Sequence, residues 1–314
     1  MLVHTIPKIP TDKSLYNQTE PSECTVEELK ELRKFPKYNT IQKVIHAIYF
    51  IIFGIPKIIL SLLFALIAGP FFLIAAGIWR SIGRPESWRN PLKKIWSSMA
   101  RVFLFLMGFH RIHYHGGLDA DSRFIVANHI CFFDGWLFLP FGPRPLGKKE
   151  MLNIPILREM ADVYRGIPVD RSKSSGVAKQ LVEFAQDKNS PMIMILPEGA
   201  STSGEYMLRF HLGAFLSDLP VQPASIRYTI YGSPASLSHV SYFHHQPYQW
   251  IVFLGIPSIK IDIHLFQPMS LKSEGQNDPR TFADQTSLKI ANELGVRLLN
   301  LSSSSIYKKE NPNK

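Results

Sequence analysis

Hydrophobic residues in this chain are concentrated in one long stretch near its start. Residues 44–55 are apolar apart from one histidine, and after a Pro-Lys pair the run 58–79 holds 22 residues without a charge. The second run is long enough to cross a hydrocarbon core of about 30 Å, whereas the first is short for a full crossing. Neither run has a polar face, which disfavours a helix packed in a soluble core. We therefore expect residues 44–79 to bind the protein to a membrane.

Two arrangements fit this membrane segment. One is a single transmembrane helix with an interfacial lead-in, and the other is a helical hairpin that enters the membrane and returns, with a break at Pro56 or at Gly69-Pro70. Three lysines precede the segment, and six basic residues follow it between Arg80 and Arg101. Positive residues on both flanks suit two ends on the cytosolic side, which favours the hairpin.

A second apolar pattern follows over residues 95–109. Bulky hydrophobic residues are interleaved there with Ser97, Ser98 and Arg101 at helical spacing. This spacing predicts an amphipathic helix, which lies either in the membrane interface or on the globular domain. We expect residues 80–110 to form a basic juxtamembrane region that contains this helix.

Beyond residue 110, short apolar runs alternate with amphipathic ones. The predicted strands are 111–115, 123–127, 163–169, 192–196, 221–230 and 259–266. Predicted helices begin at Trp136, cover 174–187 and close the domain over 279–298, with Asp278 as N-cap and Pro279 as the first helical residue. Strands that alternate with helices predict an α/β fold, with a mostly parallel sheet flanked by helices.

These patterns divide the chain into five regions. They are a polar, solvated tail (1–43), the membrane segment (44–79), the juxtamembrane region (80–110), the globular domain (111–302) and a basic, loose tail (303–314). Within the first tail, Thr25 and Glu28 have the spacing of a capping box, which predicts a short helix to about Lys34.

Composition indicates an anionic partner. The net charge is +10 and the isoelectric point is near 9.5, which suits nucleic acid, an anionic membrane surface or a phosphorylated substrate. The basic residues gather beside the apolar segment and no nucleic-acid-binding motif occurs, so we expect no nucleic acid. The two cysteines, Cys24 and Cys131, indicate a reduced compartment without a disulfide framework. His113 and His115 share a strand face without a third ligand near them in the sequence, so we expect no metal site.

Candidate chemistry lies where the predicted strand 123–127 ends. Asn128, His129 and Asp134 follow directly. A histidine oriented by an aspartate is the simplest arrangement for taking a proton from an alcohol. The carboxylate fixes the histidine tautomer and stabilises the imidazolium that forms.

Three further polar blocks stand at strand ends, namely Gly166 to Arg171, Glu198-Gly199 and Val221 to Pro223. Arg171 carries a planar guanidinium suited to a phosphate. Because open α/β sheets bind ligands beyond the carboxyl ends of their strands, we expect the blocks to face one site.

In their order and spacing, the four blocks resemble the PlsC-type glycerolipid acyltransferases, over about residues 95–270. Gly213-Ala214-Phe215 and the run from Val221 to Tyr228 look more like the lysophosphatidylcholine and lysophosphatidylethanolamine acyltransferase branch. The resemblance implies the glycerolipid acyltransferase fold and transfer of an acyl group from acyl-CoA, a co-substrate, to the free hydroxyl of a lysophospholipid. It implies no cofactor, and a place on the endoplasmic reticulum membrane with the catalytic domain facing the cytosol.

The resemblance also implies roles for individual residues. The catalytic residues would be His129 and Asp134; the substrate-binding residues would be Arg171, Glu198, Gly199, Gly166 and Asn128, with Arg171 on the acceptor phosphate and Glu198 on its glycerol hydroxyls. The sequence departs from the family where residues 200–202 follow the Glu-Gly pair and where residues 210–212 replace a lysine before Gly213. The alternatives are a lysophosphatidic acid or glycerol 3-phosphate acceptor, a catalytically silent lipid-binding membrane protein, and a hydrolase.

Overall fold

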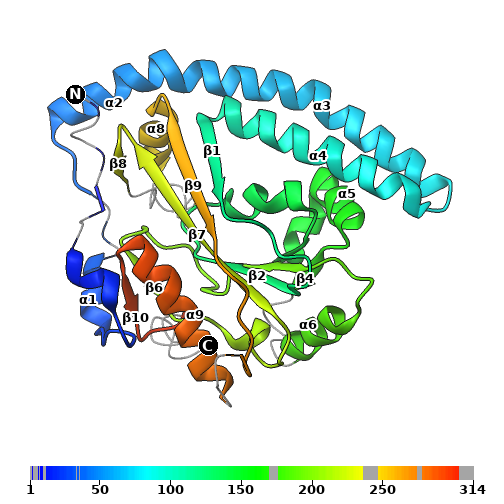
Figure 1. Cartoon of the computed structure of the whole chain (residues 1–314). Helices are drawn as coiled ribbons and strands as arrows, with labels where there is room; N and C mark the ends of the chain where they lie inside the picture. Colours follow the sequence, from blue (N-terminus) through cyan, green and yellow to red (C-terminus); the bar gives the residue numbers. More distant parts are fainter. Residues whose placement is uncertain are drawn as a thin grey trace, which may run out of the picture.

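The computed structural model describes residues 2, 6, 8–9, 12–32, 34, 36–169, 176–235, 247–273 and 278–303. In this part of the chain a mixed sheet runs through the centre of the molecule in the order β1-β9-β7-β2-β5-β3-β4, with β8 paired to β7 (Figure 1). Its strands are β1 (Phe109–His115), β2 (Phe124–Ala127), β3 (Arg144–Lys148), β4 (Ile167–Val169), β5 (Ile193–Ile195), β7 (Val221–Ile230), β8 (Ser233–Pro234) and β9 (Ile259–Leu265). Neighbours are parallel except where β7 meets β8 and β9. The predicted, mostly parallel sheet is confirmed.

The central strands are apolar on both faces because both faces are covered. Along β2, Ile125 and Ala127 point into one core cluster, and Phe124 and Val126 point into the other. The first cluster is covered by α4 (Glu86–Leu106), α8 (Pro247–Gly255) and the 3-10 helix η4 (Asp134–Phe141). The second is covered by α6 (Val177–Gln186), α9 (Pro279–Leu294) and the short 3-10 helix η6 (Leu212–Ala214).

The closing helix is shorter than predicted. Helix α9 ends at Leu294 because Gly295 adopts a left-handed conformation, with φ of 66°. The apolar residues that follow belong to β10 (Arg297–Leu299), which pairs in parallel with β6 (Tyr206–Leu208) in a separate two-stranded sheet.

The strand predicted over 163–169 is also only partly correct. Helix α5 (Pro155–Tyr164) extends to Tyr164, the chain turns at Arg165 in a left-handed conformation, and only Ile167–Val169 forms β4. The buried Val163 and Tyr164 pack against helix α4. Their apolar pattern therefore belongs to the end of an amphipathic helix. The 3-10 helix η5 (Lys149–Asn153) precedes α5.

The first region contacts the globular domain through several of its described residues, although most of them are solvent-exposed or only half-buried. The predicted capping box at Thr25 and Glu28 is confirmed, and helix α1 (Val26–Leu32) follows it. Leu29 is buried against β6 and β10. Gln18, just after the 3-10 helix η2 (Lys13–Asn17), bonds the backbone of Val296 and Leu298. The expected basic tail at the other end lies outside the described residues from position 304 onward.

The apolar segment forms one continuous helix, Thr40–Ser81. It consists of α2 (Thr40–Tyr49), a π-helical turn η3 (Phe50–Gly54) and α3 (Ile55–Ser81). Pro56 lies in the first turn of α3 and Pro70 within it, so neither of the expected breaks is present. By length and composition this helix can cross a membrane, and only 17% of its most apolar 18-residue window is buried.

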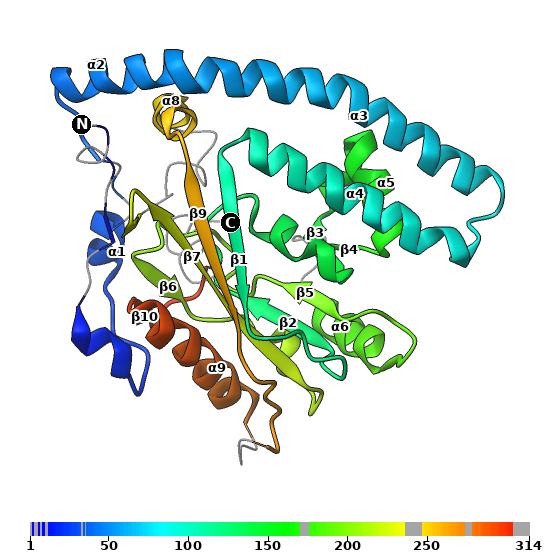
Figure 2. The ribbon, with the colours of Figure 1, turned by 45° about the horizontal axis from the view of Figure 1, so that its top comes forward.

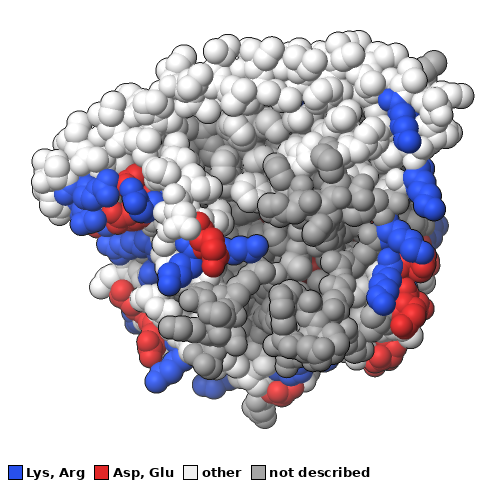
Figure 3. All heavy atoms as spheres, turned by 180° about the vertical axis from the view of Figure 1, so that it is seen from behind, with Lys and Arg blue, Asp and Glu red and all other residues white. Residues whose placement is uncertain are grey.

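Instead of a hairpin within residues 44–79, helix α4 turns back after α3 and runs beside it (Figure 2). It begins at Glu86, nine residues before the predicted start, and packs Leu92, Trp96 and Ala100 against Phe72 and Trp79 of α3. The opposite side of the long helix presents exposed apolar residues, and in the view from behind an uncharged band crosses the top of the molecule with Lys and Arg at either end (Figure 3).

Candidate active site

The candidate catalytic loop, residues 128–134, carries the predicted pair His129 and Asp134; it begins where β2 ends and is tied to the neighbouring strand β7. The Asn128 amide donates to the Ile226 carbonyl at 3.0 Å, and the Ile226 N–H donates back to Asn128 Oδ1 at 2.7 Å. This reciprocal pair extends the β2–β7 ladder by one side chain. Asn128, expected from the resemblance to bind substrate, has its amide engaged in holding the loop.

His129 and Asp134 meet as the sequence predicted. The Nδ1 of His129 lies 2.9 Å from Asp134 Oδ2. Because a carboxylate only accepts, this contact places the ring proton on Nδ1 and leaves the Nε2 lone pair as a proton acceptor. The Asp134 side chain is fully buried, whereas that of His129 is 22% exposed. The candidate base is therefore accessible from solvent, whereas the residue that orients it is not.

Asp134 is held by four donors. Its Oδ2 also accepts from the backbone N–H groups of Ile130 at 2.6 Å and Cys131 at 2.8 Å, and its Oδ1 accepts from the hydroxyl of Tyr228. A buried carboxylate is stable only when such donors replace its water. Tyr228 was missed as a site residue because it stands almost a hundred positions further along the chain. The signal was its hydroxyl within the predicted strand 221–230, which proves to be the buried strand that flanks β2.

Glu198 lies against the backbone of the candidate catalytic loop. One carboxylate oxygen accepts from the His129 N–H at 2.7 Å and the other from the Leu208 N–H at 2.8 Å. The His129 carbonyl in turn accepts from the Thr202 N–H at 2.9 Å. Burial raises the pKa of Glu198 to about 8, although the two N–H donors oppose that shift. Glu198 therefore supports the backbone of His129, and its predicted contact with the acceptor stays a prediction.

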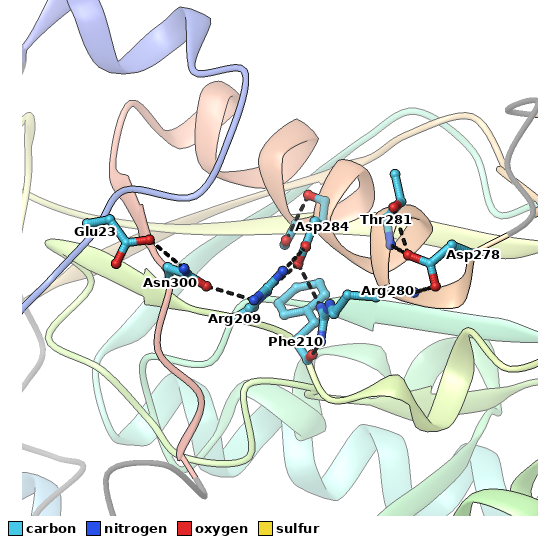
Figure 4. Close-up of polar contacts among 9 residues, drawn as sticks. Glu23, Arg209, Phe210, Asp278, Arg280, Thr281, Asp284 and Asn300 are labelled. Carbon is cyan, nitrogen blue, oxygen red and sulfur yellow. Dashed lines mark hydrogen bonds and ion pairs between the residues drawn. The ribbon is translucent and has the colours of Figure 1, made fainter.

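The strand that carries Leu208 is anchored in turn by a polar network (Figure 4). Arg209 binds Asp284 of α9 with two guanidinium nitrogens and Asn300 with the third, at 2.7 Å. Arg280 joins the same Asp284 at 2.7 Å and donates to the Phe210 carbonyl. Helix α9 thus fixes the segment that holds Glu198.

Gly199 occupies a position that requires glycine. Its φ is 71°, and a Cβ there would lie 2.7 Å from Ser303 Oγ and 2.8 Å from His211 Nε2. His211 also bonds Ser303 at 2.8 Å. The stretch in which the sequence departs from the family pattern therefore brings a histidine against the Glu-Gly block, which sequence reasoning did not assign to the site.

The second block is only partly placed. Gly166 ends the turn between α5 and β4, where its N–H donates to the Ala161 carbonyl at 2.7 Å. Strand β4 stands at the edge of the sheet, separated from β2 by β5 and β3. Arg171 lies outside the described residues, so its predicted contact with the acceptor stays untested.

The remaining candidates are the two cysteines and the histidines of β1. Cys131 lies within the loop and is buried, and Cys24 is half-buried. His115 has a partner that the sequence did not reveal, because its Nε2 lies 3.1 Å from Asp262 of β9. Within the described residues no group of three or more His, Cys, Asp or Glu side chains is placed to hold a metal ion.

Comparisons with known proteins show what this chain is similar to. A family model described as Acyltransferase matches residues 111–227. Lysophosphatidylcholine acyltransferase 1 of Danio rerio is 24% identical over 284 residues, which cover 85% of this chain and 53% of that protein. The lysophospholipid acyltransferase LPCAT4 of Homo sapiens is 26% identical over 210 residues, which cover 63% of this chain and 39% of that protein. The chain thus spans about half the length of the curated relatives it matches.

A solved structure supports the fold. The crystal structure of PlsC, the 1-acyl-sn-glycerophosphate acyltransferase of Thermotoga maritima, matches with a TM-score of 0.55 at 19% identity. The match covers 76% of this chain and 95% of PlsC. It extends the likeness to the elements on either side of the matched family segment. Residues 111–227 of this chain are thus similar to the acyltransferase family, and the chain has the PlsC fold.

Proposed function

We propose that this chain is an acyltransferase that moves an acyl group from acyl-CoA to the free hydroxyl of a lysophospholipid. The observation that carries the proposal is the His129–Asp134 pair, oriented for base chemistry, within a segment of the acyltransferase family. The names of the relatives favour lysophosphatidylcholine or another lysophospholipid as the acceptor. The name of PlsC favours lysophosphatidic acid as the alternative.

The mechanism requires no covalent enzyme intermediate, because a thioester is already activated. His129 Nε2 takes the proton of the acceptor hydroxyl as its oxygen attacks the thioester carbonyl, and Asp134 stabilises the imidazolium. The tetrahedral intermediate then collapses, the carbon–sulfur bond breaks, and the departing CoA sulfur receives the proton from His129. The net products are the phospholipid ester and CoA thiol.

Arg171 is the proposed partner of the acceptor phosphate. Arg171→Ala should then raise the Michaelis constant for the acceptor more than that for acyl-CoA, by about tenfold for the loss of one charge-assisted contact. The reverse pattern would reassign Arg171 to the phosphates of CoA. Glu198 is fully buried, so direct binding of the acceptor requires the carboxylate to become accessible. Each of its oxygens accepts one backbone N–H and can accept a second donor.

The long helix suits a position along the membrane surface better than a crossing. Its buried side chains form one stripe that follows the domain over most of its length, comprising His46, Gly54, Lys57, Ser61, Gly69, Phe72, Ala76 and Trp79. Lys57 donates to the Ile256 carbonyl just beyond the end of α8, where the negative end of that helix lies. A helix that left the domain to cross the bilayer would forfeit these contacts.

We therefore place the apolar band of Figure 3 in the cytosolic leaflet of the endoplasmic reticulum membrane, with both ends of the helix on the same side. This accounts for the positive charge on both flanks without a hairpin. In a Cys24→Ser background, Lys37→Cys and Ser81→Cys should both react with an impermeant thiol reagent from the cytosolic side of sealed microsomes. Labelling from opposite sides would show a crossing.

The activity is tested with labelled acyl-CoA and a panel of lysophospholipids, lysophosphatidic acid and glycerol 3-phosphate. Membranes carrying the wild type should form product with a lysophospholipid, and membranes carrying His129→Ala should not. Preference for lysophosphatidic acid or glycerol 3-phosphate would change the proposed acceptor. No product with any acceptor from folded protein would favour a silent lipid-binding role.

A further inference from the structure

Strand β7 is longer than its neighbour β2 and continues beneath the catalytic loop. The two strands pair in parallel up to Ala127 and Ala224, where β2 ends. Strand β7 continues to Ile230. The Asn128 side chain bonds the backbone of Ile226, whose side chain lies in the first core cluster. Tyr228, two residues further along β7, projects into that cluster as well. The pairing of β2 with β7 therefore places the Tyr228 phenol on the buried side of the loop.

The Tyr228 hydroxyl is a permanent donor in this position. The side chain is 1% exposed, and its ring packs against Phe109, with ring centroids 6.1 Å apart. Burial, together with the negative charge of Asp134, raises the pKa of Tyr228 well above its ordinary value. The phenol therefore stays protonated at any pH at which the protein works, and its proton is directed to Asp134 Oδ1.

The other three donors to Asp134 all belong to the loop itself. They are the His129 ring and the N–H groups of Ile130 and Cys131, and all three bond Oδ2. Among the donors to Asp134, Tyr228 alone comes from the sheet, and it bonds the other oxygen. Contacts within a loop move with the loop, whereas a contact to a central strand fixes the carboxylate relative to the scaffold.

On the basis of the proposed function, we infer that Tyr228 is a positioning residue of the catalytic pair. Its hydroxyl holds the Asp134 carboxylate with Oδ2 toward His129, and it withdraws negative charge from that carboxylate. Less charge on Asp134 stabilises the imidazolium less, so the Tyr228 hydroxyl also modulates how strongly the pair holds a proton. Tyr228 would thus set both the orientation and the basicity of the proposed base.

Tyr228→Phe is the direct test because it keeps the ring and removes only the hydroxyl. Freed of one donor, Asp134 gains effective charge, so the pKa of His129 should rise and the acid limb of the kcat/KM profile should move to higher pH. We expect kcat to fall by about tenfold, part of the general-base contribution, with both Michaelis constants within about twofold of wild type. A core residue that only packs would reduce the amount of folded protein and leave the pH profile unmoved.

Tyr164→Phe is the matched control. Tyr164 is also fully buried, and its hydroxyl donates to the Lys93 carbonyl at 2.9 Å, where α5 meets α4. Loss of this hydroxyl should leave both kcat and the pH profile of the full-length enzyme as in wild type. The double variant Asp134→Asn with Tyr228→Phe should lose little beyond Asp134→Asn alone, because the two residues act as one unit.

A second readout separates failure of this inference from failure of the proposed function. Titration of the His129 imidazole by NMR, assigned through its absence in His129→Gln, requires no turnover. An inactive wild type would overturn the acyltransferase proposal, and a raised His129 pKa in Tyr228→Phe would still support the inference. An unchanged His129 pKa in Tyr228→Phe, or an active Tyr228→Phe with wild-type kcat and pH profile, would overturn the inference about Tyr228.

Discussion

The candidate catalytic loop and the long apolar helix both depart from the usual placement of side chains. The loop buries a charged group, and the helix exposes apolar ones. In the loop a carboxylate, Asp134, is fully buried and surrounded by donors. Along the helix, aliphatic side chains such as Leu66 and Ile67 are more than 70% exposed. Both arrangements are costly in isolation, since buried charge needs partners and exposed apolar surface needs a cover. The loop finds its partners within the chain, whereas the cover proposed for the helix is a lipid surface. Changes in the two regions should therefore separate turnover from membrane binding.

The largest expected separation comes from Asp134→Asn. The amide can donate to His129 Nδ1, which favours the wrong tautomer and leaves Nε2 without its lone pair. We expect acyl transfer to fall by about 10²-fold or more while the fraction of protein that sediments with membranes stays unchanged. Assays on isolated membranes, matched for protein amount, measure both quantities. Full activity in this variant would remove Asp134 from the proposed mechanism.

The converse change is on the helix. Leu66→Arg with Ile67→Arg places two charges in the apolar band, and the bound fraction on lipid vesicles should fall at least about tenfold. Turnover of a water-soluble, short-chain acceptor should persist, because the loop is untouched. Gln186→Arg with Asn189→Arg adds the same charge at exposed positions on and after α6 and serves as control. Equal binding by the two double variants would show that the band does not contact lipid.

A smaller effect on activity is expected from Glu198→Gln, because Glu198 supports the backbone of His129 and is not the proposed proton acceptor. Burial raises the folded-state pKa of Glu198 from its ordinary 4.5 to about 8. The stability linked to this proton is therefore complete below about pH 4.5 and is lost as pH rises toward 8. The wild type should lose a few degrees of melting temperature between pH 5 and pH 8 that Glu198→Gln does not lose. Glu183→Gln, at an exposed carboxylate, should melt with the wild-type pH dependence.

The sequence predicted what depends on neighbours along the chain. Strand β7 has its predicted limits, and the His129–Asp134 pair forms because the two residues share one loop. The fold class followed from the alternation of elements. The end of α5 was misread because its buried residues also fit a strand, and tertiary packing on α4 decided between the two.

The sequence could not predict contacts between distant segments. Tyr228 reaches Asp134 only through the register of β7 beside β2, and Glu198 meets His129 and Leu208 only once β5 and β6 are in place. Gln18 binds the far end of the chain, so residues 12–32 looked like a free tail. Periodicity identifies buried faces, but it does not identify the polar groups that meet across them.

One measurement tests the central claim most directly, namely acyl transfer from acyl-CoA to lysophosphatidylcholine by membranes carrying equal amounts of folded wild type or His129→Ala. The proposed base predicts that the variant loses at least about 10²-fold of the wild-type rate while binding membranes equally well. A folded His129→Ala protein that transfers acyl groups at the wild-type rate would contradict the assignment of His129 as the base.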